Sequence, residues 1–411
     1  MVKPGYKQTE IGVIPEDWDS INLNEIGTFS KGKGIKKTDV VENGLPCIRY
    51  GELYTHYDDV IRKFYSYIPY EIALGSKKLK KGDILFAGSG ETAEEIGKCA
   101  AYVGDEEAYA GGDIVIFTPI DQDEMYLGYL LNSHVTMKQK ERLGQGDAVV
   151  HISSSSLGQL IVPIPPLPEQ KAIASTLNDV DALIGSLERL IAKKRDIKRA
   201  AMRKLLDPGQ AWMKRRLGDT SIIKARIGWQ GLTTAEYLES GNYFLVTGTD
   251  FENGFIGWGN CHYVDESRYL QDRHIQLKQH DILVTKDGTI GKVAFVDELQ
   301  RPATLNSGIF VVRPVNGAFE PEFFYHLMHS GMFSKFLDQL SAGSTINHLY
   351  QKDFVNFEYQ IPETLSEQKN IAATLTAMDK EISAINRRLE KTRELKQGMM
   401  QELLTGRIRL V

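Results

Sequence analysis

The feature that most constrains this fold is a long stretch of helical character that occurs twice. Residues 169–206 superimpose on residues 367–404 with a constant shift of 198 positions and no gap. Neither copy contains proline and each contains a single glycine, so both predict long uninterrupted helices. Residues that recur unchanged 198 positions later include Ile173, Ala174, Thr176, Leu177, Asp181, Ile184, Arg189, Lys193, Arg195, Lys198, Met202, Leu205 and Leu206.

Apolar residues in both copies follow a 3-4-3-4 spacing, which is the seam of a coiled coil. A seam needs a partner, and the other helix of the same chain is the obvious one. Because the second globular region must return the chain to the start of the second helix, we expect antiparallel pairing. The expected seam consists of Leu177, Val180, Ile184, Leu187 and Ile191 with Leu375, Met378, Ile382, Ile385 and Leu389.

The repeat continues outside the helices. Residues 79–85 resemble residues 277–283, and His151 corresponds to His348. A period near 198 residues predicts two similar globular domains separated by helices. The expected segments are globular domain 1 at 1–167, spacer helix 1 at 168–208, globular domain 2 at 209–364 and spacer helix 2 at 365–411.

Short apolar or alternating runs between turn residues predict strands in both globular regions. One helix is expected to follow in each region, at 125–142 and 321–340, where apolar residues are spaced for one buried face. Strands without strict alternation with helices favour an α+β class, with two mixed domains and an antiparallel helix pair. The expected strands are 45–49, 83–87, 98–103 and 113–118, then 243–247, 281–285, 292–296 and 308–313.

The charge of the chain is unevenly distributed. The net charge is -5, yet each predicted spacer helix carries nine basic against six acidic residues, which leaves the globular regions strongly acidic. A nucleic-acid surface on those regions must therefore be a local patch. Three scattered cysteines and no long apolar run indicate a cytoplasmic protein without disulfides, structural zinc or membrane spans.

Two basic segments occupy similar places in the two globular regions. Each combines cations with glycines that permit close backbone approach to phosphate, and the second adds an aromatic ring. Either one alone is equally well explained as a solvated turn, and their recurrence favours DNA contact. Their candidate residues are Lys31, Lys33, Lys36 and Lys37 in the first, and Lys224, Arg226 and Trp229 in the second.

Two further recurring elements are loops that suit DNA recognition. One joins neighbouring strands at 89–98 and 286–292, and the other lies at 144–151 and 343–348. Small polar groups and exposed backbone N–H groups there can contact base edges and phosphates, although a plain link between helix and strand is the alternative. The candidates are Ser89, Lys98 and His151, then Lys286, Gly288, Thr289, Lys292, Ser344, Thr345 and His348.

The catalytic alternatives rest on weaker patterns. The run Phe-Ala-Gly-Ser-Gly at 86–90 follows a predicted strand, as in many S-adenosylmethionine pockets, but its counterpart at 284–288 lacks the first glycine. His326 and His329 have helical spacing without an evident third metal ligand, which favours a packed or solvated helical pair. We find no phosphate loop, nucleophile elbow or zinc-protease motif, so no catalytic or metal residue is assigned.

The layout resembles the DNA-specificity subunit of type I restriction–modification enzymes over essentially the whole chain. The resemblance rests on the run Thr-Glu-Ile-Gly-Val-Ile-Pro-Glu-Asp-Trp at 9–18, Gly-Asp-Ile-Leu at 82–85, the proline-rich run with Glu-Gln at 163–170, and Ser-Glu-Gln at 366–368. The tandem repeat adds to these motifs. The first unit departs from the family loop by its insertion at 88–95, and the second junction lacks the proline-rich run.

The resemblance implies two target-recognition domains, each reading one half of a bipartite asymmetric site on double-stranded DNA. It implies that the helices set the spacing and dock two modification subunits, with restriction subunits outside them. By the same analogy this chain is not an enzyme and holds no cofactor, and S-adenosylmethionine belongs to the modification subunit. Lys98 with its match Lys292 and His151 with its match His348 are carried over as DNA contacts, and the sequence Gly288-Thr289 in the second unit fits the family loop.

Two other classes of function remain open. One is a self-sufficient S-adenosylmethionine-dependent methyltransferase using residues 86–90. The other is a scaffold or inhibitor that copies the subunit but reads no DNA. The half-sites, the length of the spacer and the number of subunits do not follow from the sequence.

Overall fold

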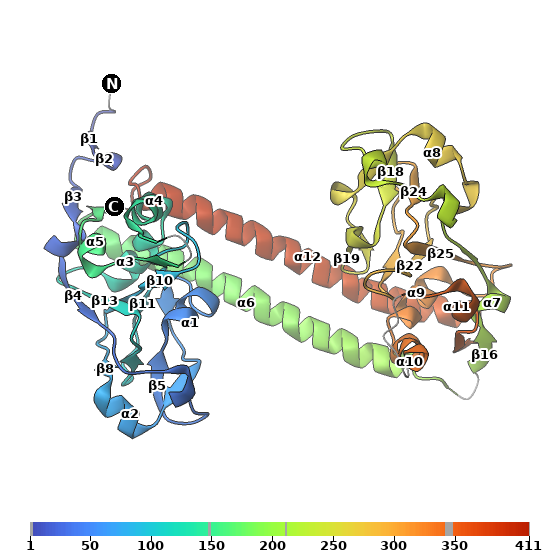
Figure 1. The fold of residues 1–411 in the computed structure, drawn as a ribbon, viewed down its shortest axis with the longest axis horizontal. Coiled ribbons are helices and arrows are strands. Elements are labelled where there is room, and N and C mark those ends of the chain that lie inside the picture. The colour runs from blue at the N-terminus through green and yellow to red at the C-terminus, as the bar shows by residue number, and fades with distance from the viewer. Residues whose placement is uncertain (1–2, 147–148, 210–211, 342–347, 411) are drawn as a thin grey trace. The chain divides into compact units, whose positions relative to one another are not determined.

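The computed structural model describes residues 3–146, 149–209, 212–341 and 348–410. The chain packs as two compact units, shown with their elements in Figure 1. Unit 1 comprises Met1–Glu188 with Arg387–Val411, and unit 2 comprises Arg189–Asn386. Each unit therefore contains one globular region together with half of each long helix, whereas the four segments expected from the sequence separate globular regions from helices. Across the described ranges, every helix is too short or too polar to cross a membrane.

The two long helices are present and have the same length. α6 spans Leu167–Leu205 and α12 spans Leu365–Leu403, each with 39 residues. Their starts differ by the same 198 positions as the sequence repeat. At 1.5 Å per residue, each helix is about 58 Å long. The second junction lacks the proline-rich run, yet α12 begins at the position that corresponds to the start of α6.

The packing inside each unit shows that the helices are antiparallel. In unit 1, Leu403 at the end of α12 lies in the same core as Ile173 and Leu177 near the start of α6. In unit 2, Leu206 just after α6 shares a core with Leu375 near the start of α12. The end of one helix thus meets the beginning of the other in both units, as the chain connection predicts.

The expected seam is covered along both helices. Its members are buried or half-buried, and polar residues flank them. The buried positions are Leu177, Leu187, Ile191, Leu375, Ile382 and Leu389, and the half-buried ones are Val180, Ile184, Met378 and Ile385. The prediction of an antiparallel coiled coil is confirmed.

The globular region of unit 1 is built on a five-stranded sheet of order β4-β13-β9-β11-β6 and a four-stranded sheet of order β7-β5-β12-β8. Its strands are β1 (Tyr6–Thr9), β2 (Gly12–Pro15), β3 (Asp19–Asn22), β4 (Gly27–Lys31), β5 (Leu45–Ile48), β6 (Val60–Ile61), β7 (Ser66–Ile68), β8 (Lys77–Lys78), β9 (Ile84–Ala87), β10 (Ser89–Gly90), β11 (Cys99–Tyr102), β12 (Tyr109–Ala110), β13 (Ile114–Pro119), β14 (Val150–His151) and β15 (Ile161–Ile164). Its short helices are α1 (Tyr50–Thr55), α2 (Tyr70–Gly75), α3 (Glu124–Leu131), α4 (His134–Leu143) and α5 (Ser154–Gly158).

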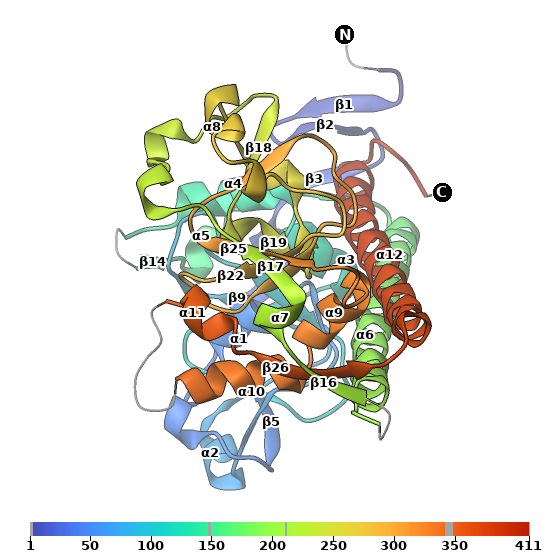
Figure 2. The ribbon, with the colours of Figure 1, turned by 90° about the vertical axis from the view of Figure 1, so that its right-hand side faces the viewer.

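Unit 2 has a six-stranded sheet of order β17-β25-β22-β23-β20-β19 and a three-stranded sheet of order β21-β18-β24, and β16 pairs with β26 (Figure 2). Its strands are β16 (Trp212–Arg216), β17 (Ser221–Lys224), β18 (Tyr243–Val246), β19 (Phe251–Glu252), β20 (Phe255–Ile256), β21 (His262–Val264), β22 (Ile282–Thr285), β23 (Val293–Phe295), β24 (Ala303–Leu305), β25 (Ile309–Pro314) and β26 (Glu358–Pro362). Its short helices are α7 (Leu217–Thr220), α8 (Glu266–Leu270), α9 (Pro321–Met328), α10 (Gly331–Leu340) and α11 (Gln351–Phe354).

The two sheets repeat one topology. The order β4-β13-β9-β11-β6 in unit 1 corresponds strand by strand to β17-β25-β22-β23-β20 in unit 2. Both contain antiparallel pairs and one parallel pair, β11 with β6 and β23 with β20. Mixed sheets joined by short helices are the predicted α+β class, and the tandem repeat is a repeat of structure as well as of sequence.

The prediction of a single helix after each sheet is wrong, because the structure has two shorter helices in each place. α3 ends before Asn132 and α4 begins after Ser133, while α9 ends before His329 and α10 begins after Ser330. The Ser330 hydroxyl accepts a hydrogen bond from the backbone N–H of Met332, which caps a new helix. The apolar spacing continues across the break, so periodicity alone does not reveal it.

Candidate nucleic-acid interface

The loop that follows β22 in unit 2 is tied to two distant parts of the chain. The backbone N–H of Lys286 donates to the carbonyl of Gly308 at 2.8 Å, and the N–H of Leu349 donates to the carbonyl of Lys286 at 2.8 Å. Asp287 then forms an isolated antiparallel bridge with His348. Two recurring elements that the sequence shows separately therefore meet at one place.

Unit 1 repeats this backbone frame. Gly88 donates its N–H to Asp113 at 2.9 Å and accepts from the N–H of Ile152 at 3.0 Å. The short strands β10 and β14 pair Ser89 with His151. Gly88, Ser89 and His151 thus occupy the positions of Lys286, Asp287 and His348, although the unit 1 loop before β11 is longer.

A histidine ring is held by the loop in both units. In unit 1, the Nδ1 atom of His151 lies 2.9 Å from the hydroxyl of Ser89. In unit 2, the Nδ1 atom of His348 is hydrogen-bonded to a carboxylate oxygen of Asp287. The engaged Nδ1 atom fixes each ring and leaves Nε2 for another partner. His151 is exposed and His348 is about one-third exposed, so both rings can be reached from solvent.

The loop lysines of the two units are structurally equivalent. The carbonyl of Lys98 accepts from the N–H of Ala87, and that of Lys292 accepts from the N–H of Thr285, each at 2.9 Å. Lys292 is exposed, whereas the ammonium of Lys98 lies 3.9 Å from the carboxylate of Asp58. Lys292 is therefore the freer of the two for a phosphate oxygen.

The remaining loop residues of unit 2 form a tight turn. Gly288 has a φ of +69°, a conformation that favours glycine, and Thr289 is exposed beside it. The hydroxyl of Thr285 donates to the carbonyl of Thr289 at 2.5 Å and accepts from the N–H of Lys292 at 2.9 Å. Lys286 is half-buried, with its ammonium 5.4 Å from the centre of the Phe310 ring. The turn is thus closed by its own hydrogen bonds.

The basic segment of unit 1 is exposed, and its backbone is hydrogen-bonded to the neighbouring strands. The N–H of Gly32 donates to Ile114 at 2.9 Å and that of Lys33 donates to Ala110 at 3.0 Å. A Cβ atom on Gly32 would lie 1.9 Å from the carbonyl oxygen of Gly111, so only glycine fits there. The exposed cations of this ordered segment are Lys31, Lys33, Lys36 and Lys37.

A family model described as the type I restriction modification DNA specificity domain matches residues 15–194 and again 210–396. The chain belongs to this specificity family. It is 27% identical to a putative type I restriction enzyme MjaX specificity subunit from Methanocaldococcus jannaschii, over 98% of this chain and 97% of that protein. It is 26% identical to the MjaVIII specificity subunit of the same organism, over 97% and 94% of the two chains.

A solved structure of a specificity subunit has the same fold. The crystal structure of the type I restriction-modification S subunit from M. genitalium matches with a TM-score of 0.62 at 17% identity, covering 94% of this chain and 96% of that one. The resemblance that the sequence motifs carry is thus confirmed at the level of the family and of the fold, and this chain is a DNA sequence-specificity subunit of the type I class.

Arg226 was expected at the DNA surface of this specificity subunit, and the structure contradicts that prediction. Its side chain is 1% exposed, and its guanidinium donates to the carbonyl of Leu305 at 2.8 Å and to the hydroxyl of Thr304 at 3.2 Å. Burial lowers its pKa from the usual arginine value. Arg226 therefore joins the second basic segment to the three-stranded sheet and does not face a phosphate. The neighbouring Lys224 is exposed.

Three of the expected DNA-contacting side chains are not described by the structure. Ser344 and Thr345 lie outside the described residues, as does the rest of 342–347. The side chain of Trp229 is likewise not described, although its backbone lies in the 3-10 turn Gly228–Gln230. These three residues remain predictions.

The stretch at 86–90 includes the end of β9, which lies in an antiparallel part of its sheet. β9 pairs antiparallel with both β13 and β11, unlike the parallel strands of a doubly wound nucleotide fold. The hydroxyl of Tyr54 donates to the carbonyl of Ser89 at 3.0 Å and would lie 2.8 Å from a Cβ atom on Gly90. The two glycines thus serve strand pairing and the close approach of a tyrosine.

Of the two histidines, His326 on α9 is buried, whereas His329, the residue that follows α9, is exposed. His326 is completely buried, with Nε2 2.9 Å from the hydroxyl of Thr376, and burial lowers its pKa to about 3. Within the described ranges, the His, Cys, Asp and Glu side chains form no group that could hold a metal ion.

Asp287 is the residue at this site that the sequence analysis did not single out. It lies inside the loop at 286–292, but acidic residues are common in this chain and its partner is 61 positions away. Alignment of the two units places Asp287 on Ser89, and this correspondence was the available signal.

Proposed function

We propose that this chain reads two different half-sites on double-stranded DNA, one with the loops of each unit. The observation that carries the proposal is the pair of equivalent frames with different side chains, Ser89 with His151 and Asp287 with His348. A shared frame supports a shared mode of approach to a groove. Different hydrogen-bonding groups on that frame favour different base sequences, and hence an asymmetric site.

The chemistry of the loops supports this division of labour. Exposed Lys292 in unit 2 suits a phosphate oxygen, while Thr289 beside it offers a hydroxyl. The longer loop of unit 1 carries exposed Glu91, Glu94 and Glu95. Carboxylates accept hydrogen bonds from the amino groups of cytosine and adenine in the major groove, but repel phosphates. Unit 1 would therefore take its phosphate contacts from Lys31, Lys33, Lys36 and Lys37.

The specificity subunit would act inside a larger complex in the cytoplasm. We propose that α6 and α12 fix the interval between the half-sites and dock two modification subunits, with restriction subunits outside them. In this assembly S-adenosylmethionine and the methyltransferase site belong to the modification subunit, and this chain binds without catalysing. Membership of the specificity family supports this arrangement.

The test is selection of binding sites from random duplexes by the purified chain together with its modification subunit. The expected result is a site in two parts with a gap of constant length, because continuous helices join the units. Selection of one continuous sequence, or of no sequence, would contradict the proposal. A methyltransferase encoded by a neighbouring reading frame would be the partner to use in this experiment.

Equilibrium dialysis of this chain alone against labelled S-adenosylmethionine tests the absence of a cofactor site. We expect retention at background level. Tight, saturable binding that is lost on substitution of Gly88 would restore the hypothesis of a self-sufficient methyltransferase.

A further inference from the structure

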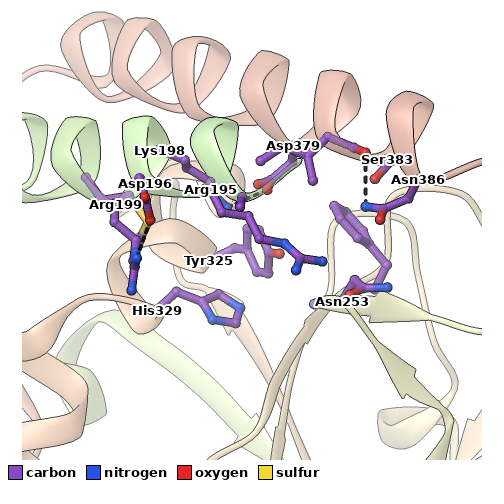
Figure 3. Close-up of a pocket in the computed structure, with 15 residues that line it drawn as sticks. Arg195, Asp196, Lys198, Arg199, Asn253, Tyr325, His329, Asp379, Ser383 and Asn386 are labelled. Carbon is purple, nitrogen blue, oxygen red and sulfur yellow. Dashed lines mark hydrogen bonds and ion pairs between the residues drawn. The ribbon is translucent and has the colours of Figure 1, made fainter. Parts of the chain in front are cut away.

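Unit 2 contains a pocket of about 680 Å³ between its portions of α6 and α12, the turn from β19 to β20, and α9 (Figure 3). Its cationic lining comes from one face of α6, with Arg195, Lys198 and Arg199. Asp379 and Asn386 of α12 face them, as Figure 3 shows. The volume is sufficient for a small molecule.

The charges in this pocket are not balanced. Lys198 forms an ion pair with Asp379 at 2.5 Å, and Arg199 forms one with Asp196. Arg195 also projects into the pocket, and no carboxylate in the described part of the chain lies within 4.0 Å of its guanidinium. One cation therefore faces the pocket without a counter-charge.

The internal repeat allows this pocket to be compared with the equivalent place in unit 1. A shift of 198 positions places Arg195 on Arg393 and Lys198 on Lys396 of unit 1. In unit 1, the guanidinium of Arg393 lies 2.6 Å from Glu188 and 2.9 Å from Glu390. The equivalent arginine of unit 1 is thus held by two carboxylates.

The equivalent lysine of unit 1 also has one carboxylate more. Lys396 lies 2.7 Å from Asp59 and 2.7 Å from Asp181, whose counterpart in unit 2 is Asp379. Burial alone would lower the pKa of Lys396, but these two carboxylates raise it above the usual lysine value. In unit 2, Lys198 has Asp379 and no second carboxylate partner in the described ranges.

All three missing carboxylates correspond to neutral residues that line the pocket. The shift of 198 replaces Glu188 by Asn386 and Glu390 by Ala192. Asp59 corresponds to Gly254, because the carbonyl of each accepts an N–H from the adjacent strand, Ala101 or Phe295, at 2.9 Å. Unit 2 keeps both cations of the network and loses three of its anions.

The loss of Asp59 also opens a neutral donor to the pocket. Tyr325 is 3% exposed and lines the cavity, and its hydroxyl makes no hydrogen bond to another described residue. A Cβ atom on Gly254 would lie 2.2 Å from that hydroxyl. The glycine thus leaves room for a hydroxyl where unit 1 has a carboxylate.

We propose that the pocket of unit 2 binds a small oxyanion, either inorganic phosphate or a small carboxylate. Its oxygens take the place of the lost carboxylates, accepting hydrogen bonds from Arg195 and from the Tyr325 hydroxyl. A planar guanidinium binds two oxygens of such an anion at once, and charge-assisted hydrogen bonds are the stronger kind. The corresponding place in unit 1 takes no anion, since Arg393 and Lys396 are already paired.

Equilibrium dialysis of the full chain against labelled phosphate tests this proposal, with labelled succinate as a parallel arm. We expect one site per chain at low ionic strength, and the tighter of the two ligands identifies the chemistry. The double substitution Ala192→Glu with Asn386→Glu restores two carboxylates of unit 1 and should weaken binding by about tenfold, the loss of one charge-assisted contact. Arg195→Gln, on an exposed helix position, should do the same.

The matched control is the reciprocal change in unit 1. Glu188→Asn with Glu390→Ala removes both partners of Arg393 and should add a second, weaker phosphate site. Helical circular dichroism verifies that each variant remains folded. No retention of either anion at millimolar concentration, or binding that Arg195→Gln leaves unchanged, overturns the proposal.

Discussion

The Nδ1 atom of His348 is hydrogen-bonded to the carboxylate of Asp287. The Nδ1 atom of the equivalent His151 is hydrogen-bonded to the hydroxyl of Ser89, at 2.9 Å. A carboxylate favours a donating Nδ1–H, whereas a hydroxyl can donate or accept. The Nε2 atom of a neutral His348 therefore presents an acceptor, whereas that of His151 can present either a donor or an acceptor. This is a chemical difference between two histidines that are held by equivalent backbone frames.

Substitution of one pair should change one half-site only. His348→Ala or Asp287→Ala is expected to relax the bases selected by unit 2, with a loss of about 1–3 kcal/mol of discrimination at the affected position. His151→Ala is the matched control and should relax the other half-site. Selection from random duplexes measures both. Equal relaxation of the two half-sites by either variant would contradict separate reading.

The loop lysines should govern the salt dependence of DNA binding. Each lysine that neutralises a phosphate contributes about 0.9 to the slope of log K against log salt concentration. Lys292→Ala with Lys286→Ala should therefore reduce the slope by about 1 to 2, with the larger part from exposed Lys292. Lys369→Ala removes an exposed charge from α12 and serves as the control. An unchanged slope in the double variant would favour a scaffold that reads no DNA.

The glutamines at the starts of the long helices should stabilise the junctions. The side chain of Gln368 is buried, accepts from the N–H of Glu320 at 2.9 Å and donates to the carbonyl of Pro362 at 2.9 Å. Gln170 makes the equivalent contacts with Asp123 and Pro165. Gln368→Ala leaves buried polar groups unpaired and should lower the free energy of unfolding of unit 2 by about 2–3 kcal/mol.

Hydrogen exchange of unit 2 amides measures this loss of stability. Gln170→Ala should cause a similar loss in unit 1 instead. A substitution to Glu at position 368 keeps the acceptor for Glu320 but places a buried carboxylate against the carbonyl of Pro362, so its effect should be at least as large as that of Gln368→Ala. Protection that stays at the wild-type level in Gln368→Ala would show that the junction does not depend on this side chain.

The sequence predicts those parts of the fold that depend on local patterns. The strand expected at 281–285 is β22 (Ile282–Thr285), and the helix seam from Leu177 to Ile191 is covered as its spacing requires. Such elements follow from periodicity, which a single sequence displays. The boundary between α9 and α10 does not, because Ser330 caps a helix without interrupting the apolar pattern.

Residues whose role depends on distant partners were harder to predict. Arg226 has the charge and the glycine neighbourhood of a phosphate contact, yet its guanidinium is held inside by Leu305 and Thr304, 79 and 78 positions away. Lys33 lies in a segment whose composition is equally well explained as a solvated turn, and its backbone N–H is hydrogen-bonded to the carbonyl of Ala110, 77 positions away. The charge of a side chain can be read locally, whereas its burial is decided by contacts that a local pattern does not contain.

His326 should make unit 2 sensitive to acid. It is completely buried on α9, its Nδ1 atom lies 4.0 Å from Asp379, and burial, with Lys198 and His329 nearby, lowers its pKa to about 3. Above pH 6.5 the ring is neutral in both the folded and the unfolded state, so it adds no pH dependence. Below pH 6.5 the His326 ring becomes protonated in the unfolded chain, whereas in the folded unit it stays neutral until about pH 3. The free energy of unfolding should fall in this window by up to about 1.4 kcal/mol per pH unit.

His326→Gln removes the titrating ring, so its unit 2 amides should lose less protection than wild type between pH 6.5 and 4. His134→Gln, at an exposed position of unit 1, should retain the wild-type dependence. Identical acid dependence in His326→Gln and wild type would mean that other groups set the acid stability of unit 2.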